Sequence, residues 1–138
     1  MKVLITLLIA LTTTTFSLFS QNTQTITVTI SNVSSNEGTV KFGLHTKETF
    51  MKGNPFQATE SKIENGKCKI VFKNVPAGEY AITCFHDKNG NGKMDFQSNG
   101  MPLEAYGASN NVMNFGPPQY DDAKFTITDK DVSLDIKL

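Results

Sequence analysis

Arginine is absent from this chain, and all 13 basic residues are lysines. They balance 13 Asp and Glu residues, so the formal net charge is zero. Bidentate recognition of phosphates and guanine edges depends on arginine. A neutral domain also has no electrostatic bias toward polyanions or anionic membranes. The composition therefore argues against a nucleic-acid-binding protein.

Cysteine is scarce, with only Cys68 and Cys84, in strand-like runs on either side of a turn at 75–78. In an exported protein an oxidising environment would permit a disulfide between them. Alternatively, both are buried thiols that pack as small hydrophobic groups. The Cα separation that a disulfide requires is not encoded in the spacing, so both alternatives remain open.

The first twenty residues, MKVLITLLIALTTTTFSLFS, combine an early Lys2, a long apolar run and small residues near the end. This layout is typical of a secretory signal peptide, which we expect at 1–20 with cleavage near Ser20. The threonines at 12–15 and the lack of a following charged cluster argue against a membrane anchor. No cysteine lies in this segment, which argues against a lipid-anchored lipoprotein. We expect a periplasmic or secreted protein with one domain at 21–138, which is long enough for a packed core.

No stretch of ten residues shows helical periodicity, whereas period-two alternation recurs along the chain. Ile26, Val28 and Ile30, for example, alternate with threonines. The expected strands are 25–33, 39–46, 58–64, 67–75, 75–86, 123–129 and 131–138. Six or seven short strands with frequent turn signals predict an all-β fold, an antiparallel β-sandwich. The connection at 87–120 is unusually long, and such connections usually have a function or local order of their own.

The stretch FHDKNGNGKMDFQSNG at 85–100 contains the D-x-[DN]-x-[DN]-G spacing of calcium loops. Ca²⁺ prefers six to eight oxygen ligands, and a glycine at the sixth position permits the sharp bend that lets them converge. That position is Gly92 when Asp87 is counted as the first. The expected ligands are the side chains of Asp87, Asn89, Asn91 and Asp95 and the backbone carbonyl of Lys93.

The twelfth position of the loop is Ser98 instead of the bidentate glutamate of an EF-hand, and no helices flank it. Glu104 could fold back as the remaining ligand. We therefore expect one structural Ca²⁺ on a β scaffold, bound with a Kd of about 10⁻⁴ to 10⁻³ M. The alternative is a pair of Asn-Gly turns without a metal. That alternative explains 89–92 but not the aspartates at matching offsets.

Other residues offer little chemistry. Zinc needs three or four suitable ligands, and the spacing of His45 and His86 supports no such set. His86 is expected to cap its strand or contact the loop, and His45 to lie on the surface. Ser109, in YGASNN, lacks the G-x-S-x-G context of a hydrolase nucleophile. We therefore expect no enzymatic activity.

The long connection interleaves aromatic and amide side chains, which could stack on and hydrogen-bond a sugar. Burial of the aromatic rings against the core is the favoured alternative, because large apolar side chains are stabilised by burial. These residues are Tyr106, Asn110, Asn111, Phe115 and Tyr120.

VPAGEYAITCFHDKNGNGKMD, followed by GMPLEAYGASNN and FGPPQYDDAKFTI, resembles the bacterial family known as domain of unknown function 2141. The resemblance covers roughly Ile26 to Leu138. Its centre is a Pro-x-Gly-x-Tyr turn, a His-Asp pair, the Asn-Gly-rich loop, then Pro-x-Glu-x-Tyr-Gly and Ser-Asn-Asn. It implies an exported β domain without an established activity. The Pro-Ala-Gly-Glu-Tyr turn is also similar to transthyretin-like and Cna B-type sandwiches, which implies a prealbumin-like or immunoglobulin-like architecture of about seven strands.

Together these observations predict an exported, non-catalytic β-sandwich with a structural calcium loop. We expect it to act as a binding or structural module at the cell envelope. The expected partner is a protein or a glycan, and the chain is expected to be monomeric, with no membrane span after signal cleavage. A carbohydrate- or peptide-binding module using the loop face is the first alternative, and a hydrolase is the second.

Overall fold

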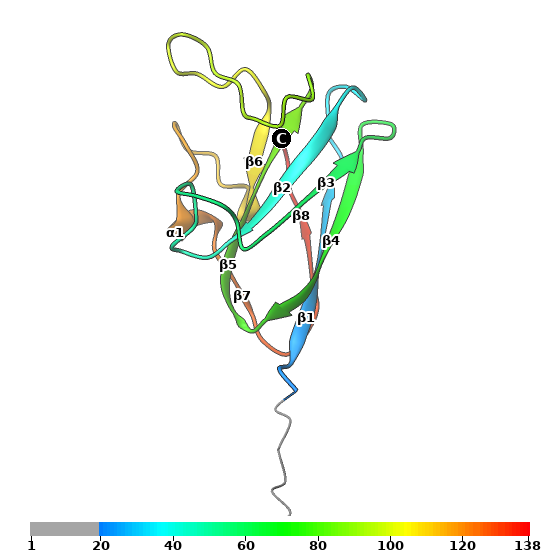
Figure 1. The fold of residues 1–138 in the computed structure, drawn as a ribbon, viewed down its shortest axis with the longest axis vertical. Helices are drawn as coiled ribbons and strands as arrows, with labels where there is room; N and C mark the ends of the chain where they lie inside the picture. Colours follow the sequence, from blue (N-terminus) through cyan, green and yellow to red (C-terminus); the bar gives the residue numbers. More distant parts are fainter. Residues whose placement is uncertain (1–19) are drawn as a thin grey trace, which may run out of the picture.

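A computed structural model describes residues 20–138, so the expected signal peptide lies outside the described residues except for Ser20. The fold is a β-sandwich of two sheets with a long, ordered connection between β5 and β7 (Figure 1). The strands are β1 (Thr23–Ile30), β2 (Thr39–His45), β3 (Gln57–Lys62), β4 (Cys68–Pro76), β5 (Gly78–Asp87), β6 (Tyr106–Ala108), β7 (Phe125–Ile127) and β8 (Val132–Asp135). One short 3-10 helix, η1 (Ser109–Asn111), and one α-helix, α1 (Tyr120–Ala123), lie within the connection. Across 20–138, no helix has the length and apolar character needed to span a membrane.

The two sheets differ in size. One has the strand order β4-β1-β8, and the other has the order β3-β2-β5-β6, with β7 paired to the first residues of β5. The predicted antiparallel sandwich is confirmed, with two differences. β6 is an additional strand inside the long connection, and β8 runs parallel to β1. β7 and β8 belong to different sheets, and the chain crosses from one sheet to the other at 128–131 instead of forming a hairpin.

Alternating apolar residues build the core between the sheets. In β1 every second residue is buried, and Ile26, Val28 and Ile30 point into the core. The same alternation in β2, β4 and β5 brings Phe42, Phe72 and further aliphatic side chains into one continuous cluster. In an antiparallel sheet one face packs on the core and the other faces water, so apolar and polar residues alternate along each strand. The alternation that predicted the core strands from the sequence is therefore the alternation of burial in the structure.

The two cysteines lie in this cluster as free thiols, Cys68 on β4 and Cys84 on β5. Burial raises the pKa of the Cys84 thiol to about 12, so it is a protonated thiol at neutral pH. Of the two alternatives left open by the sequence, the structure shows the packed, unpaired one.

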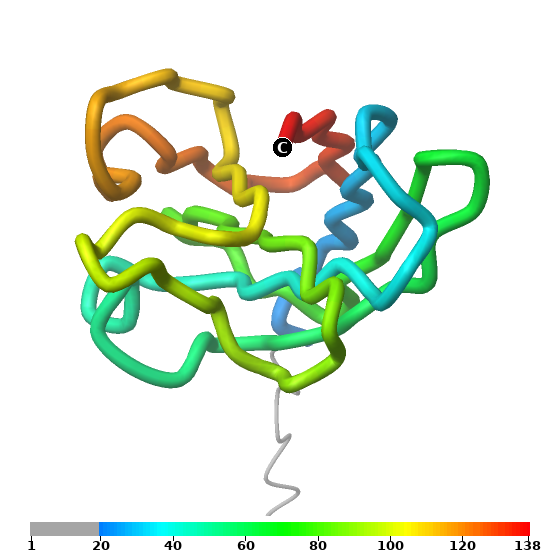
Figure 2. Tube along the Cα trace, turned by 90° about the horizontal axis from the view of Figure 1, so that it is seen from above, coloured from blue at the N-terminus to red at the C-terminus, as the bar shows by residue number. Residues whose placement is uncertain are grey.

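β5 is covered on both faces. One face packs into the main core, and on the other Ala81 packs with Phe50 of the segment after β2 and with Ala123 of α1. Asp87 is the last residue of β5, and the first loop of the long connection starts there. Seen from above, that loop and the segment around 112–118 extend on the same side of the sandwich (Figure 2).

Candidate metal centre

The loop at 87–104 starts from a buried carboxylate. Asp87, the last residue of β5, is only 1% exposed. Its backbone lies against Gly38 of the turn after β1, where a Cβ atom would collide with the Asp87 carbonyl oxygen. Gly38 also has a positive φ of 72°. Both conditions favour glycine, and they fix the point at which the loop leaves the sheet.

Side-chain oxygens at alternating positions curl the loop. Asp87 Oδ2 accepts a hydrogen bond from the Gly92 amide at 2.9 Å. Asn89 Oδ1 accepts one from the Asn91 amide at 3.1 Å, and Asn91 Oδ1 accepts one from the Lys93 amide at 2.9 Å. Gly92 has a φ of 79°, which supports the predicted reason for a glycine at the sixth position. The spacing of the sequence motif therefore produces a curled backbone with its polar side chains on the inside.

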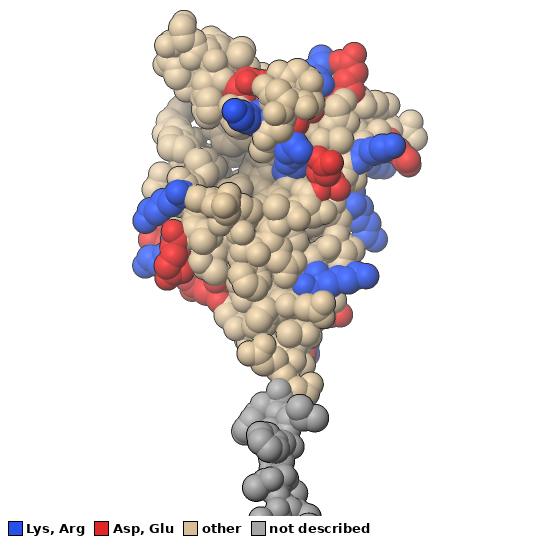
Figure 3. Space-filling model, viewed as in Figure 1, with Lys and Arg blue, Asp and Glu red and all other residues tan. Residues whose placement is uncertain are grey.

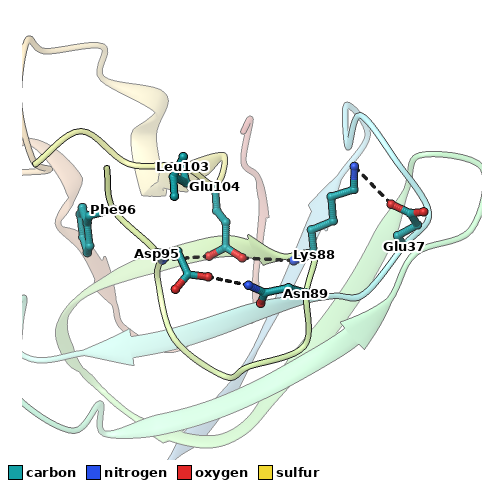
Figure 4. Close-up of a pocket in the computed structure, with 7 residues that line it drawn as sticks. All are labelled: Glu37, Lys88, Asn89, Asp95, Phe96, Leu103 and Glu104. Carbon is teal, nitrogen blue, oxygen red and sulfur yellow. Dashed lines mark hydrogen bonds and ion pairs between the residues drawn. The ribbon is translucent and has the colours of Figure 1, made fainter. Parts of the chain in front are cut away.

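The carboxylate of Asp95 closes the curl. It accepts a hydrogen bond from Asn89 Nδ2 at 2.7 Å (Figure 4). It accepts a second one from Asn91 Nδ2 at 2.9 Å. These amide groups present the positive ends of their dipoles to the carboxylate. A cation bound at this point would take over that role.

Glu104 folds back onto the loop. Its Oε1 accepts a hydrogen bond from the Lys88 amide at 3.3 Å, and its Oε2 accepts one from the Asp95 amide at 3.2 Å (Figure 4). The Leu103 amide donates to the Asp95 carbonyl at 2.8 Å and holds the returning segment in place. An open cleft of about 690 Å³ lies beside these residues. The Lys88 ammonium extends away from Asp95 to Glu37, 3.2 Å from its carboxylate.

Asp87 is incompletely satisfied. Its Oδ1 is buried and has no hydrogen-bond partner among the described residues. The nearest cation is Lys41 Nζ, 3.9 Å from Oδ2. Lys41 is itself held by Glu60 at 2.5 Å, and that hydrogen bond raises the pKa of Lys41. A buried carboxylate with one free oxygen is destabilising unless a further partner is bound.

Five of the predicted ligands belong to one hydrogen-bonded network, Asn89, Asn91, Asp95 and Glu104 with the Lys93 amide. Asp87 is bonded to the same loop through the Gly92 amide. The carboxylates alone do not form a metal cluster: within 20–138, no three His, Cys, Asp or Glu side chains are grouped to hold a metal ion. Amide and backbone oxygens would have to complete the coordination shell, and hard cations such as Ca²⁺ accept them. The donor set therefore fits calcium and does not fit zinc.

The two histidines are both buried. His86 Nε2 lies 2.7 Å from the Glu37 carbonyl, so the His86 ring contacts the turn after β1. The prediction of a surface position for His45 was wrong: its ring is 3.0 Å from Thr83 Oγ1 and packs edge-on against Phe50. The segment 46–52 covers this face of the sheet, and no period-two signal in β2 indicated that cover. Burial lowers the pKa of His45.

Ser109 and its neighbours have structural contacts. The buried Ser109 hydroxyl accepts a hydrogen bond from the Ile82 amide at 3.0 Å and donates to the Ala123 carbonyl, which ties β5 to α1. The side-chain amides of Asn110 and Asn111 donate to backbone carbonyls of 122, 124 and 135. Tyr120 packs edge-on against Phe50. Among the aromatic residues considered for sugar binding, Tyr106 and Tyr120 are half-buried, whereas Phe115 is fully exposed.

Sequence reasoning missed an apolar groove beside the loop at 87–104. It has a volume of about 580 Å³, and its lining includes Met94 and Phe96 on either side of Asp95, followed by Met101. The sequence does contain a signal for this groove, because apolar side chains interrupt the polar loop in MDF at 94–96 and in MPL at 101–103. Period-two patterns do not report such positions, because they lie outside strands.

A comparison with curated proteins finds no match. Among solved structures, "Pilus-presented adhesin, Spy0125 (Cpa)" is similar to this chain at 12% identity and a TM-score of 0.29. The alignment covers 85% of this chain but only 26% of the adhesin chain, and a likeness this distant implies nothing about what this chain binds. A protein-family model matches residues 28–135 and confirms the resemblance seen in the sequence. The chain belongs to the bacterial family described as "Uncharacterized protein conserved in bacteria (DUF2141)".

Proposed function

We propose that this protein is an exported, non-catalytic β-sandwich module of the bacterial cell envelope whose loop at 87–104 binds one structural Ca²⁺. The ligands are the side chains of Asp87, Asn89, Asn91, Asp95 and Glu104 and the backbone carbonyl of Lys93. The composition of residues 1–20 supports export to the periplasm or beyond. The ion orders the loop and thereby the surface that the loop presents to a partner protein or glycan.

The observation that carries the calcium proposal is the buried, unpartnered Oδ1 of Asp87. The Asp87 carboxylate faces the loop, because its Oδ2 accepts a hydrogen bond from the Gly92 amide. A cation inside the curl would satisfy Oδ1 and would neutralise the charge that Asp95 and Glu104 add nearby. The same buried atom has no role in a plain pair of Asn-Gly turns.

The non-catalytic part of the proposal is supported by the contacts of Ser109, the serine considered as a nucleophile from the sequence. Its hydroxyl is buried and bonded to backbone groups of Ile82 and Ala123. A serine nucleophile needs an adjacent general base, and within 20–138 neither histidine is a hydrogen-bond partner of Ser109.

The test is a thermal melt of the chain from residue 20 onward, in excess EDTA and then in calcium. With a Kd of about 10⁻⁴ M, about 10 mM calcium stabilises the folded state by about 2.7 kcal/mol. For a domain of this size that raises the Tm by about 10 °C. The same concentration of Mg²⁺ should give a smaller shift, because Mg²⁺ prefers a smaller octahedral site and keeps its water ligands.

Asp87→Asn is the decisive variant, with Glu64→Gln as the matched removal of an exposed carboxylate on another turn. Asp87→Asn should abolish the calcium shift but melt in EDTA at or above the wild-type temperature, because it removes an unsatisfied buried charge. Glu64→Gln should leave the shift unchanged. The calcium proposal would be refuted by a wild-type Tm that does not respond to calcium. It would equally be refuted by an Asp87→Asn variant that keeps the full response.

A further inference from the structure

The tip of the loop at 112–116 exposes large apolar side chains. Met113 and Phe115 are 96% and 113% exposed, the highest values among the large apolar residues of 20–138, and Val112 is half-exposed. Between them, Asn114 Nδ2 donates to the Asp122 carboxylate at 2.5 Å. Tyr106 donates to the Gly116 carbonyl at 3.4 Å. These contacts tie the tip to α1 and β6, so Met113 and Phe115 stand free of their own domain.

The apolar groove described above lies beside this tip. Its walls include Met51, Phe85, Met94 and Met101, and none of its lining residues is charged. One wall is the segment 116–118, which continues directly from Phe115. Figures 1 and 2 place the segments 94–104 and 112–118 next to each other, and Figure 3 shows the surface hollowed below the lobe at the upper left. An exposed apolar protrusion and an uncharged apolar recess are therefore adjacent on one face.

We propose that this face is the interface of a homodimer, in which Phe115 of each copy inserts into the groove of the other. A two-fold axis between protrusion and groove places each protrusion of one copy opposite the groove of its partner, as an isologous interface requires. The dimer departs from the monomer expected from the sequence.

Two features favour a second copy as the occupant. The groove has no charged side chain to pair with a charged ligand, and the two most exposed side chains of the tip, Met113 and Phe115, are apolar. Soluble proteins rarely leave contiguous apolar surface of this kind uncovered. The flexible thioethers of the three groove methionines can also adapt to an inserted aromatic ring, and sulfur–aromatic contacts are favourable.

The test is sedimentation velocity in saturating calcium, from about 5 µM to about 500 µM chain, a range that detects micromolar self-association. We expect the mass to rise from one chain to two. Phe115→Asp removes the inserted group and Met101→Asp blocks the groove, so each variant alone should remain a single chain. Mixed together, they should recover one insertion and form a heterodimer, weaker than the wild-type dimer.

The matched control is Leu103→Asp, since Leu103 is 62% exposed and Met101 59%, but Leu103 lines the cleft beside Glu104 and does not line the groove. It should dimerise like the wild type. Thermal melts of all variants verify that they fold. The proposal is overturned by a single-chain mass at every concentration, or by dimerisation that Phe115→Asp does not weaken. A single-chain protein that binds the neutral dye N-phenyl-1-naphthylamine would also overturn it, because the groove would then serve another apolar ligand.

Discussion

β5 joins two parts of the molecule that are stabilised by different interactions. Along its length, Tyr80, Ile82 and Cys84 pack into a continuous apolar core shared by both sheets. The loop at 87–104 is instead organised by hydrogen bonds between carboxylates, amides and backbone, with no buried apolar side chain. The sandwich is therefore stable through burial, which no ligand needs to complete. The loop depends on polar contacts that leave one buried oxygen without a partner.

The difference implies that the two parts respond to different perturbations. Loss of apolar volume should unfold the sandwich, whereas the loop should respond to cations and to the removal of single charges. The variants below separate these responses, from the largest expected effect to the smallest.

Phe72→Ala should cause the largest loss. Phe72 is almost fully buried in β4 at the centre of the core, and removal of such a ring costs about 3–5 kcal/mol. Urea denaturation should report this loss in EDTA and in calcium alike. A loss that calcium largely restores would show that core and loop are not the separate units described above.

Ser109→Ala should cost about 1–3 kcal/mol, because it leaves the buried Ile82 amide without its side-chain acceptor. The effect should be larger than that of Ser133→Ala, a serine on the exposed side of β8. Chemical denaturation of both variants provides the comparison. Equal stabilities would contradict the structural role of the hydroxyl between β5 and α1.

The period-two pattern was sufficient to predict the strands of the core, because residues such as Val28 and Phe42 are buried by the same alternation that the sequence displays. A different signal, the D-x-[DN]-x-[DN]-G spacing, was sufficient to predict the curl of the loop, since the positions from Asp87 to Asp95 are close in the chain. Neither signal revealed the cover over His45, the strand β6 or the groove at Met101. Those features depend on contacts between segments far apart in the chain, and no local pattern encodes such contacts.

His45 should make stability depend on pH. Its ring is buried and uncharged, and burial lowers its pKa. Below the unfolded pKa of about 6.5 the unfolded chain takes up a proton at this histidine that the folded protein does not. The free energy of unfolding therefore decreases as the pH is lowered. The loss approaches about 1.4 kcal/mol per pH unit until the folded pKa is reached. Urea denaturation at pH 7.5 and 5.5 should show it. The drop should be smaller in His45→Gln, and a wild type without any drop would contradict the assignment.

Lys41→Met should give the smallest effect, and it acts on both parts at once. On β2 it loses the partly exposed ion pair with Glu60, which is worth at most about 1 kcal/mol. At the loop it removes a positive charge 3.9 Å from the Asp87 carboxylate. Calcium should then bind a few-fold more tightly, because it no longer competes with the ammonium group, while the Tm in EDTA falls slightly. Calcium titration followed by the Tm measures both changes. Weaker calcium binding in this variant would mean that Lys41 orients Asp87 instead of competing for it, and Glu60→Gln, which keeps the ammonium group, distinguishes these roles.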